Sequence, residues 1–504
     1  MSRAAETNER DAGDGSGTAF VPDLLYTGER FLQDAALVCD AAGAILSITP
    51  VAELKASNYP GRVVSLKGRA LLPGLVNAHS HAFQRVIRGR TEYRSARHKS
   101  DSFWTWREMM YAAAARLTPE DLYDASRMAF AEMALCGITT VGEFHYLHRT
   151  PAGDPYDDPN LLARQVVRAA RDTGLRIALL RVAYARSGFR LPPNERQRRF
   201  IETDPDEYLR NLADLRAALA HDDAPDAHRT AWVGLAPHSI RAVPLNYLHE
   251  IIAYADAEAL PVHMHLAEQP AELEACRAEH RRTPVELLFA EGLVGAQFTA
   301  VHAVHITPEE ARSLGEFAAV VCACPTTERN LGDGIVPADL LFREGVRISL
   351  GTDSQTQIDL LEDARELEYH LRLRKLERAV LSPRRDSVLV AFPSGATEER
   401  ESPSLLAAEL FECATVHGTR STAAPGSGLL APGSPADFFT VDLNDPSIAG
   451  ASAEDLLAVV VFSATRTAVR DVCVGGRFIV ADGRHAAQHE IVERFAALQR
   501  RLWS

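Results

Sequence analysis

Two histidine pairs, each spaced two residues apart, are the residues of this chain best suited to chemistry. His79 and His81 end the apolar run 71–78, and His263 and His265 lie in the run 260–267. On a strand, residues i and i+2 point to the same face. Two neutral imidazole nitrogens ~2.0–2.1 Å from one centre form half of a zinc site. The spacing therefore indicates metal-assisted chemistry, with His79, His81 and one histidine of the second pair as candidate ligands.

Other titratable side chains close further apolar runs. His302 ends the run 300–301, Asp353 follows the run 348–351, and Glu268 stands three residues after His265. A buried His or Asp without a partner is costly, so each of these residues needs a role that satisfies it. A structural hydrogen bond could explain any one of these residues taken alone. Because they stand at the ends of several strands, coincidence is improbable and a shared site is indicated.

The middle of the chain alternates apolar strand patterns with amphipathic helix patterns, which is typical of repeated β-α units around a parallel sheet. The strands are expected to end near His79, His145, Tyr184, Pro237, His265, His302, Cys322 and Gly351. Eight such units favour a closed (β/α)8 barrel of the TIM type, in which residues at the C-terminal strand ends face the active site. A doubly wound open sheet is the alternative, although no Gly-x-Gly-x-x-Gly follows a strand.

Short β-like runs before residue 70 and after residue 425 flank this middle part. We therefore expect an α/β protein whose barrel, residues 71–424, carries a small composite β-sandwich domain formed by both termini, residues 20–70 and 425–504. Residues 1–19 are polar and glycine-rich and are expected to form a disordered tail. The stretch 384–404, rich in Pro, Ser, Gly and Glu, is expected to be a surface insertion, and we assign it no function.

Composition limits the function classes. The chain has 504 residues, 46% of them hydrophobic, and a formal net charge of −14. This charge argues against nucleic acid or an anionic membrane as partner, but it permits a local basic pocket for an acidic small molecule. No run approaches the ~20 apolar residues that span a bilayer, so we expect a cytoplasmic protein. The seven scattered cysteines are expected to be reduced thiols, with Cys322 and Cys324 packed in a buried strand.

The set His79, His81, His265, His302 and Asp353 resembles the metal and catalytic residues of the amidohydrolase superfamily. A small β domain made of both termini is also typical of that superfamily. Many members hold two metal ions bridged by a carbamylated lysine on the fourth strand, but the expected fourth strand, 231–237, has no lysine. The resemblance therefore implies one metal ion per chain, with His79, His81, His265 and Asp353 as ligands. Zn²⁺ suits three imidazoles and a carboxylate, and iron would also fit.

Mononuclear members of the superfamily are mostly deaminases, and Glu268, three residues after His265, matches their pattern. Zinc lowers the pKa of a bound water from 15.7 towards ~7, which makes it able to attack a C=N carbon. In such chemistry Asp353 accepts a proton from the attacking water, and His302 polarises or protonates the group under attack. Glu268 then passes protons to the departing ammonia. The alternative for Glu268 is a hydrogen bond that braces His265.

Longer segments resemble the formimidoylglutamate deiminase family, which acts in histidine degradation. They are residues 79–85, 103–111, 142–148, 193–200, 236–243 and 324–334, and so they extend over nearly the whole barrel. The resemblance implies hydrolysis of N-formimidoyl-L-glutamate to N-formyl-L-glutamate and ammonia, and a homodimer. One departure is Gln355, which stands where the family usually has an asparagine directly after the serine of Asp353-Ser354.

Such a substrate carries two carboxylates and a small cationic end, so its site needs donors at one end and acceptors at the other. Arg241 and His238, three residues apart, can clamp a carboxylate, with the Tyr146 hydroxyl as a further donor. Gln84 can hold the formimidoyl nitrogen beside Glu268. The alternatives are loop packing for Tyr146, a structural role for Gln84 and a surface ion pair for Arg241.

Two questions remain open at this level. Arg198 or Arg199 is a further candidate for the anionic end of the substrate, with solvation at the surface as the alternative. The competing functions are deamination of a ring substrate of the purine, pterin or triazine type, and a non-catalytic zinc-binding scaffold. Aromatic stacking without anion clamps would favour the first, and the intact set of His302, Asp353 and Glu268 argues against the second.

Overall fold

An eight-stranded parallel sheet forms the centre of the computed structural model, which describes residues 17–93, 102–222, 229–383, 388–391, 397–400, 403–424 and 426–504. The strands neighbour one another in sequence order, and a parallel bridge between Ser80 and Asp353 links the first to the last. This order confirms the predicted barrel and excludes a doubly wound sheet, whose strand order reverses. The barrel strands are β6 (Leu75–Ser80), β7 (Ile138–His145), β8 (Arg176–Ala183), β9 (Ala231–Pro237), β10 (Val262–Leu266), β11 (Phe298–His302), β12 (Val320–Ala323) and β13 (Arg347–Leu350).

These strands read as continuous apolar runs because both faces of the sheet are covered. Every residue of β6, β7, β8 and β9 is buried. Cys322 and Cys324 pack with Ala78 and Val301 inside the barrel, and the seven cysteines are free and buried. The C-terminal strand ends lie within two residues of the expected positions.

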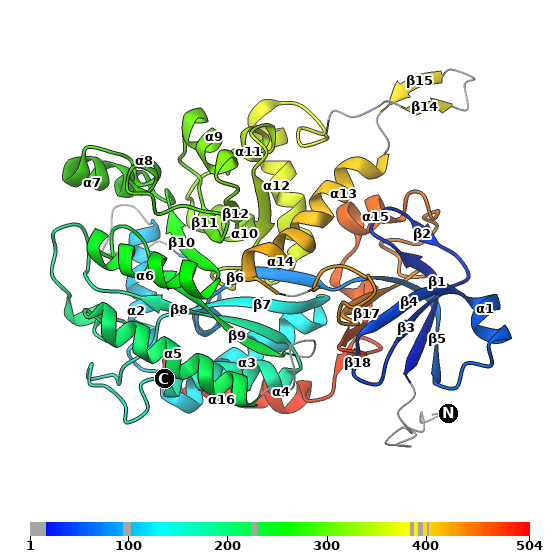
Figure 1. Ribbon diagram of the computed structural model, residues 1–504, viewed down its shortest axis with the longest axis horizontal. Helices are drawn as coiled ribbons and strands as arrows, with labels where there is room; N and C mark the ends of the chain where they lie inside the picture. Colours follow the sequence, from blue (N-terminus) through cyan, green and yellow to red (C-terminus); the bar gives the residue numbers. More distant parts are fainter. Residues whose placement is uncertain are drawn as a thin grey trace.

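Helices surround the barrel (Figure 1). Three of them begin with the same local device, a threonine cap followed by proline and, at the third helical position, an acid: Thr118 before α3, Thr283 before α8 and Thr307 before α9. In each, the threonine hydroxyl and the acid satisfy backbone N–H groups that the first helical turn leaves free. The helices of the barrel part are α2 (Phe103–Ala114), α3 (Pro119–Leu135), α4 (Leu161–Thr173), α5 (Pro205–Asp222), α6 (Leu245–Glu258), α7 (Pro270–His280), α8 (Pro284–Ala290), α9 (Pro308–Glu316), α10 (Pro325–Leu331), α11 (Ala338–Arg343), α12 (Leu360–Lys375), α13 (Pro403–Cys413) and α14 (Val416–Thr422).

A second, nine-stranded sheet combines strands from both ends of the chain and lies beside the barrel (Figure 1). Phe20 of β1 packs on Phe438 of β16 and on Phe478 of β18, with ring centroids 4.9 and 5.6 Å apart. Because β1 and β18 are not adjacent in the sheet, the second contact shows that the sheet curls onto itself. The expected sandwich is therefore one continuous, folded sheet. Its strands are β1 (Thr18–Tyr26), β2 (Phe31–Leu32), β3 (Ala35–Cys39), β4 (Ile45–Pro50), β5 (Arg62–Pro73), β16 (Phe438–Asp442), β17 (Val469–Val474), β18 (Arg477–Ala481) and β19 (Arg484–His485), with α1 (Val51–Ala56) following β4.

The two sheets are joined where β5 runs into β6. A single residue, Gly74, separates them, and a Cβ atom there would lie 2.3 Å from Thr139 Oγ1. Only glycine therefore fits at this junction without a shift of Thr139. Since β6 ends at His79 and Ser80, the β domain directly anchors the strand that carries the first histidine pair.

The ends of the chain extend beyond the expected domain limits. Residues 1–16 of the expected tail lie outside the described residues, and Thr18 and Ala19 already belong to β1. At the other end, α15 (Leu456–Ser463) packs on α12 and α13, and α16 (Gln488–Trp503) lies along α3, where Arg494 forms a 2.7 Å ion pair with Asp124. The span 425–504 thus contributes to the surface of the barrel as well as to the β domain.

The stretch 384–404 contains an antiparallel hairpin, β14 (Val388–Ala391) and β15 (Thr397–Arg400), which projects from the body of the protein (Figure 1). Residues 384–387, 392–396 and 401–402 of this stretch are not among those described. Within the described ranges, no helix has the length and apolar character needed to cross a membrane.

Candidate active site

Four side chains from three strands converge at the C-terminal end of the barrel: His79 and His81 at the end of β6, His265 in β10, and Asp353 just after β13. Their ligand atoms all lie within 4.8 Å of one another. His81 Nε2 lies 3.2 Å from His79 Nε2 and 3.2 Å from Asp353 Oδ1. Two ligands of a tetrahedral zinc ion lie roughly 3.3 Å apart, given zinc–nitrogen distances of about 2.0–2.1 Å. The spacing of these residues therefore fits a zinc ion.

Backbone carbonyls fix the orientation of two of the imidazoles. His81 Nδ1 donates to the Phe144 carbonyl at 2.9 Å, and His265 Nδ1 donates to the His238 carbonyl at 3.1 Å. In each ring this leaves Nε2 unprotonated and free to coordinate a metal ion, as is usual for metal-binding histidines. His263 is different: its Nε2 lies 2.7 Å from the Ser421 carbonyl of α14, away from the cluster. The structure thus selects His265 from the second pair.

The electrostatics of the cluster match a metal site. Burial lowers the pKa of His79 to about 3, and burial also holds the pKa of His265 well below its usual value. For Asp353, burial alone would raise the pKa, but the contacts with His79 and His81 outweigh it and hold that pKa well below its usual value. His79 and His265 are therefore neutral and Asp353 is ionised, which is the protonation state that metal binding requires.

His302 and Glu268 lie beside this cluster. His302 Nε2 lies 3.7 Å from Asp353 Oδ2 and 3.8 Å from Glu268 Oε1, and its Nδ1 lies 3.2 Å from Glu328 Oε1. Burial alone would lower the pKa of His302, but Glu268, Glu328 and Asp353 together raise it well above its usual value. His302 is therefore a proton donor held between carboxylates.

Glu268 does not brace His265, because the His265 ring bonds to the backbone of His238. Glu268 lies instead in the wall of the cavity and is 6% exposed. Burial raises the pKa of Glu268 above its usual value, although His302 and Arg241 act in the opposite direction.

The backbone is unusual at the reacting residues. His302 has φ of +74° and Asp353 has φ of +45°, and neither is glycine or asparagine. Aspartate and histidine adopt this region more readily than most other residues. Both side chains thus leave the ends of their strands from a left-handed backbone conformation.

The substrate-binding candidates share one cavity with the catalytic residues. Gln84, on the 3₁₀ turn Ala82–Ile87 after His81, donates a 2.8 Å hydrogen bond to the Tyr146 hydroxyl. His238 and Arg241 lie in the loop between β9 and α6. The cavity has a volume of about 40 Å³. Its lining residues include His81, Gln84, Tyr146, His238, Arg241, His265, Glu268, His302 and Asp353.

Arg241 is buried, which excludes the alternative that it forms an ion pair at the surface. It is 8% exposed, and its Nε has no hydrogen-bond partner among the described residues. Burial and the adjacent Arg241 hold the pKa of His238 well below its usual value. The His238 imidazole is therefore neutral, and of these two residues only Arg241 carries a positive charge. Burial alone would lower the pKa of Arg241, but Tyr184, Glu272 and Glu268 raise it. Although these acids lie nearby, Arg241 forms no ion pair among the described residues, so its Nε can still bind an anionic ligand.

A second arginine, Arg107, also lines the cavity and was missed in the sequence. Its Nε and Nη1 are buried and have no hydrogen-bond partner among the described residues. Its guanidinium carbon lies 4.5 Å from the Trp104 ring centroid, and that of Arg241 lies 5.8 Å from the same ring. The helical spacing in the sequence could have indicated it, because on helix α2 Arg107 shares a face with Phe103 and Tyr111, which also line the cavity.

Arg198 and Arg199 do not reach the cavity. Arg198 is half-buried, pairs with Glu195 and donates to the Pro151 carbonyl at 2.7 Å. Arg199 is 2% exposed, but it donates to the backbone carbonyls of Arg149, Ala114 and Leu117. Arg199 therefore joins segments of the fold and is not available to a substrate.

Gln355 is also structural. It is fully buried, donates from Nε2 to Ser80 Oγ at 2.8 Å and accepts from Thr352 Oγ1 at 3.0 Å. Its φ of +60° lies in the left-handed region, which asparagine adopts more readily than glutamine. The backbone conformation thus explains why an asparagine suits this position.

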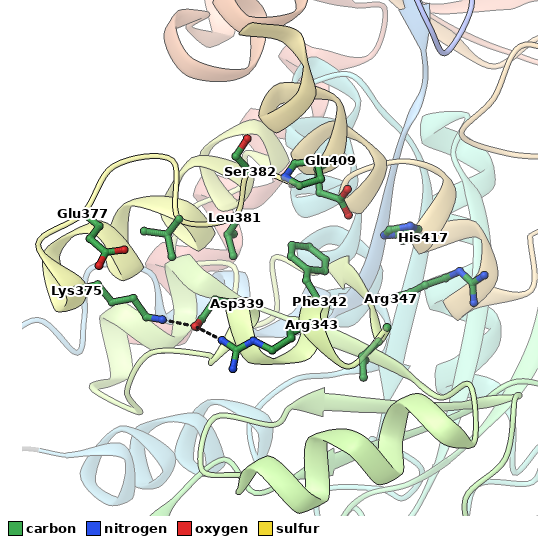
Figure 2. Close-up of a pocket in the computed structure, with 14 residues that line it drawn as sticks. Asp339, Phe342, Arg343, Arg347, Lys375, Glu377, Leu381, Ser382, Glu409 and His417 are labelled. Atoms are coloured by element: carbon green, nitrogen blue, oxygen red, sulfur yellow. Dashed lines mark hydrogen bonds and ion pairs between the residues drawn. The ribbon is translucent and has the colours of Figure 1, made fainter. Parts of the chain in front are cut away.

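A larger cavity, of about 690 Å³, lies near Arg347 at the opposite, N-terminal end of β13 (Figure 2). Two of its cations, Lys375 and Arg343, already pair with Asp339. None of the metal ligands lines this cavity. In TIM-type barrels the active site lies at the C-terminal face, so the smaller cavity is the candidate site.

Comparisons with known proteins agree with this geometry. The profile of the amidohydrolase family matches residues 70–479. Formimidoylglutamate deiminase of Pseudomonas aeruginosa is 38% identical over 429 residues, which are 85% of this chain and 88% of that protein. The crystal structure of an amidohydrolase from Brucella melitensis superposes with a TM-score of 0.84 at 32% identity, covering 97% of this chain and 100% of the other.

A more distant fold neighbour is an adenosine deaminase from Xanthomonas campestris, solved with bound zinc. It has a TM-score of 0.75 at 21% identity and covers 97% of this chain and 98% of that one. At this identity the comparison shows a shared fold.

Proposed function

The chain belongs to the amidohydrolase family, and on that premise we propose that it hydrolyses the C=N bond of N-formimidoyl-L-glutamate, releasing ammonia and leaving N-formyl-L-glutamate. Water supplies the oxygen of the new carbonyl group, and the terminal nitrogen leaves as ammonia. The enzyme is thus a hydrolase acting on the C–N bond of a linear amidine.

One observation carries the substrate assignment. Arg107 and Arg241 line the cavity that holds the metal ligands, and neither forms an ion pair among the described residues. A substrate with two carboxylates neutralises both guanidiniums. Each charge-assisted hydrogen bond contributes about 1.5–3 kcal/mol.

His79, His81, His265 and Asp353 are the residues that hold the metal ion. We propose zinc, one ion per chain, although the same donors accept iron. When bound, the ion supplies a Lewis acid that makes water nucleophilic at neutral pH.

The remaining residues move protons and orient the substrate. Asp353 Oδ2, on the side of the carboxylate facing His302, accepts a proton from the attacking water. His302, whose Nδ1 is occupied by Glu328, polarises the group under attack from Nε2. Once water has added, the terminal nitrogen is an amine with a lone pair, and Glu268 passes to it the proton that water gave to Asp353. The second proton of the water is released as the carbonyl group forms, and the nitrogen leaves as ammonia. Gln84, fixed by Tyr146, holds the formimidoyl group between these residues.

Ring deamination is the second candidate, and one observation favours it: Phe103, Trp106, Tyr111, Tyr184 and Phe200 give the cavity an aromatic wall. An uncharged purine or triazine would stack there, but it would leave two buried guanidiniums unpaired. The dicarboxylate is therefore the better fit.

The test is ammonia release by the zinc-loaded protein from N-formimidoyl-L-glutamate, beside guanine, adenosine, cytosine and N-formimidoyl-L-aspartate at equal concentrations. Selective turnover of the glutamate derivative supports the proposal. Turnover of a ring substrate alone would refute it and favour the second candidate. If no substrate is turned over while each chain still binds one zinc ion tightly, the proposed metal centre would stand but the substrate assignment would be wrong.

We also propose that the protein acts in histidine degradation in the cytoplasm, as a homodimer, on a small dicarboxylate and without nucleic acid or membrane partners. The relative from Pseudomonas aeruginosa supports the pathway, and the seven free, buried cysteines suit a reducing compartment. Sedimentation equilibrium tests the dimer.

A further inference from the structure

A buried ion pair lies behind the aromatic wall of the cavity. Arg181, near the C-terminal end of β8, is fully buried and forms a two-pronged pair with Glu202, with Nη–Oε distances of 2.5 and 2.9 Å. Its Nε donates to Asn160 at 3.1 Å, and Glu202 also accepts from Asn211 at 3.0 Å. Removing two charges from water is costly, and an apolar pair often serves stability equally well. The pair therefore suggests a role beyond stability.

Glu202 ends a short segment, residues 197–202, which we call the strap. The strap is tied at three points. Gln197 donates to the hydroxyls of Tyr111 and Tyr184 at 2.8 and 2.7 Å. The Arg199 carbonyl accepts from the backbone N–H groups of His148 and Arg149, and the N–H of Glu202 donates to the Tyr184 carbonyl at 2.9 Å.

These ties place Phe200, in the middle of the strap, against the cavity. Its ring centroid lies 5.0 Å from that of Tyr146 and 5.9 Å from that of Tyr184, and all three rings line the cavity. Tyr146 in turn holds Gln84. The position of the strap therefore sets the wall against which the substrate packs.

We propose that the Arg181–Glu202 pair clamps the strap against β8 and thereby positions Phe200 and Tyr146 for substrate binding. Glu202 and Arg181 are positioning residues, since neither lines the cavity. The second half of the proposal rests on the proposed function, whereas the clamping of the strap does not depend on it.

The same strand provides a matched control. Arg176, the first residue of β8, forms a buried pair with Asp437 at 2.7 Å, at the opposite end of the barrel from the cavity. Glu202→Gln and Asp437→Asn each remove one charge from a buried arginine pair on β8. Only the first touches the strap.

Hydrogen exchange of the backbone amides tests the clamp without any ligand. In Glu202→Gln we expect faster exchange in residues 197–202 and at His148 and Arg149, whose amides bond to the strap. In Asp437→Asn we expect faster exchange near Gly475, whose N–H donates to Asp437 at 2.7 Å, and none in the strap. Wild-type exchange of the strap in a folded Glu202→Gln would overturn the proposal.

Steady-state kinetics test the consequence. For Glu202→Gln we expect KM for N-formimidoyl-L-glutamate to rise about tenfold with kcat within about threefold, because binding is impaired more than the proton transfers. Asp437→Asn should keep wild-type KM at a comparable loss of thermal stability. Equal KM values in both variants would leave the pair with a purely structural role.

If Glu202→Gln does not fold, Asn211→Ala removes one hydrogen bond to Glu202 and keeps the pair. It should shift strap exchange and KM in the same direction by a smaller amount, and no shift would contradict the proposal. A wild-type protein that fails to turn over the substrate would refute the proposed function, whereas the exchange experiment would still decide whether the pair clamps the strap.

Discussion

His302 Nδ1 lies 3.2 Å from Glu328 Oε1, and this contact determines which nitrogen of His302 faces the cavity. Glu328 is itself fixed, because the same oxygen accepts from the backbone N–H of Cys324 at 2.9 Å. The orientation of the proton donor is thus set by the loop after β12.

Replacing Glu328 should therefore impair the reaction more than binding. For Glu328→Ala we expect kcat to fall about 100-fold with KM within about twofold, because the tautomer and orientation of His302 are lost. Glu328→Gln, which keeps an acceptor, should recover part of this loss. Equal kcat values for the Ala variant and the wild type would show that His302 does not depend on Glu328.

Asp353→Asn should abolish turnover while the fold persists. In the proposed mechanism Asp353 is both a metal ligand and the acceptor of a proton from water, and an amide serves poorly in both roles. We expect kcat to fall at least ~1,000-fold with a circular dichroism spectrum like that of the wild type. Near-normal activity would remove Asp353 from the proton route.

The two cavity arginines should determine affinity for the carboxylates. Arg241→Met and Arg107→Met should each raise KM about 10- to 100-fold, since each loses charge-assisted bonds to a carboxylate. Arg312→Met is the control, because Arg312 of α9 is exposed, pairs with Glu344 and does not line the cavity. A variant with the KM of this control would remove the substituted arginine from the clamp.

Acid should weaken the protein in part through Glu202. Burial alone would raise the pKa of Glu202, but Arg181 and His148 outweigh it and lower that pKa to about 2. A depressed pKa contributes stability above the unfolded value of about 4.5, and this stability is lost as the pH falls towards 2. In urea unfolding, Glu202→Gln should therefore be less stable by about 3 kcal/mol at pH 7, and the difference should vanish near pH 2. A difference independent of pH would contradict this account.

Removing the metal ion should affect stability as well as activity. A chelator should lower Tm, because the ligands bind the ion only in the folded protein, and one equivalent of zinc should restore both Tm and turnover. His79→Ala provides the comparison, since its Tm should not respond to zinc. An unchanged Tm in the chelated wild type would argue against a metal ion at these four residues.

The sequence allowed the barrel, and the titratable side chains that end its strands, to be predicted because local patterns encode them. Continuous apolar runs mark buried parallel strands, and a titratable residue at the end of such a run is visible without any knowledge of the fold. The strands ending at His145, Pro237 and His302 end at the residues that the pattern indicated.

Other features depend on contacts that no local pattern encodes. Arg198 and Arg199 are adjacent and of one type, yet the first is half-buried and pairs with Glu195, whereas the second is buried and binds carbonyls of distant segments. Arg107 was missed because it comes from a helix that reaches the cavity from outside the barrel. Likewise, the curling of the β domain depends on contacts of Phe20 with residues near the other end of the chain.

The composite β domain also has a consequence for biosynthesis. Strand β5 pairs on one side with β1 and on the other, over Arg69–Pro73, with β16 from the C-terminal part of the chain. During translation the ribosome must make the whole barrel before β16 emerges, so this edge of β5, immediately before the strand that carries His79 and His81, stays open until then. The β domain, which anchors the strand leading to His79 and His81, is therefore completed only near the end of synthesis, and nascent chains truncated before Phe438 should be less stable and should depend on chaperones.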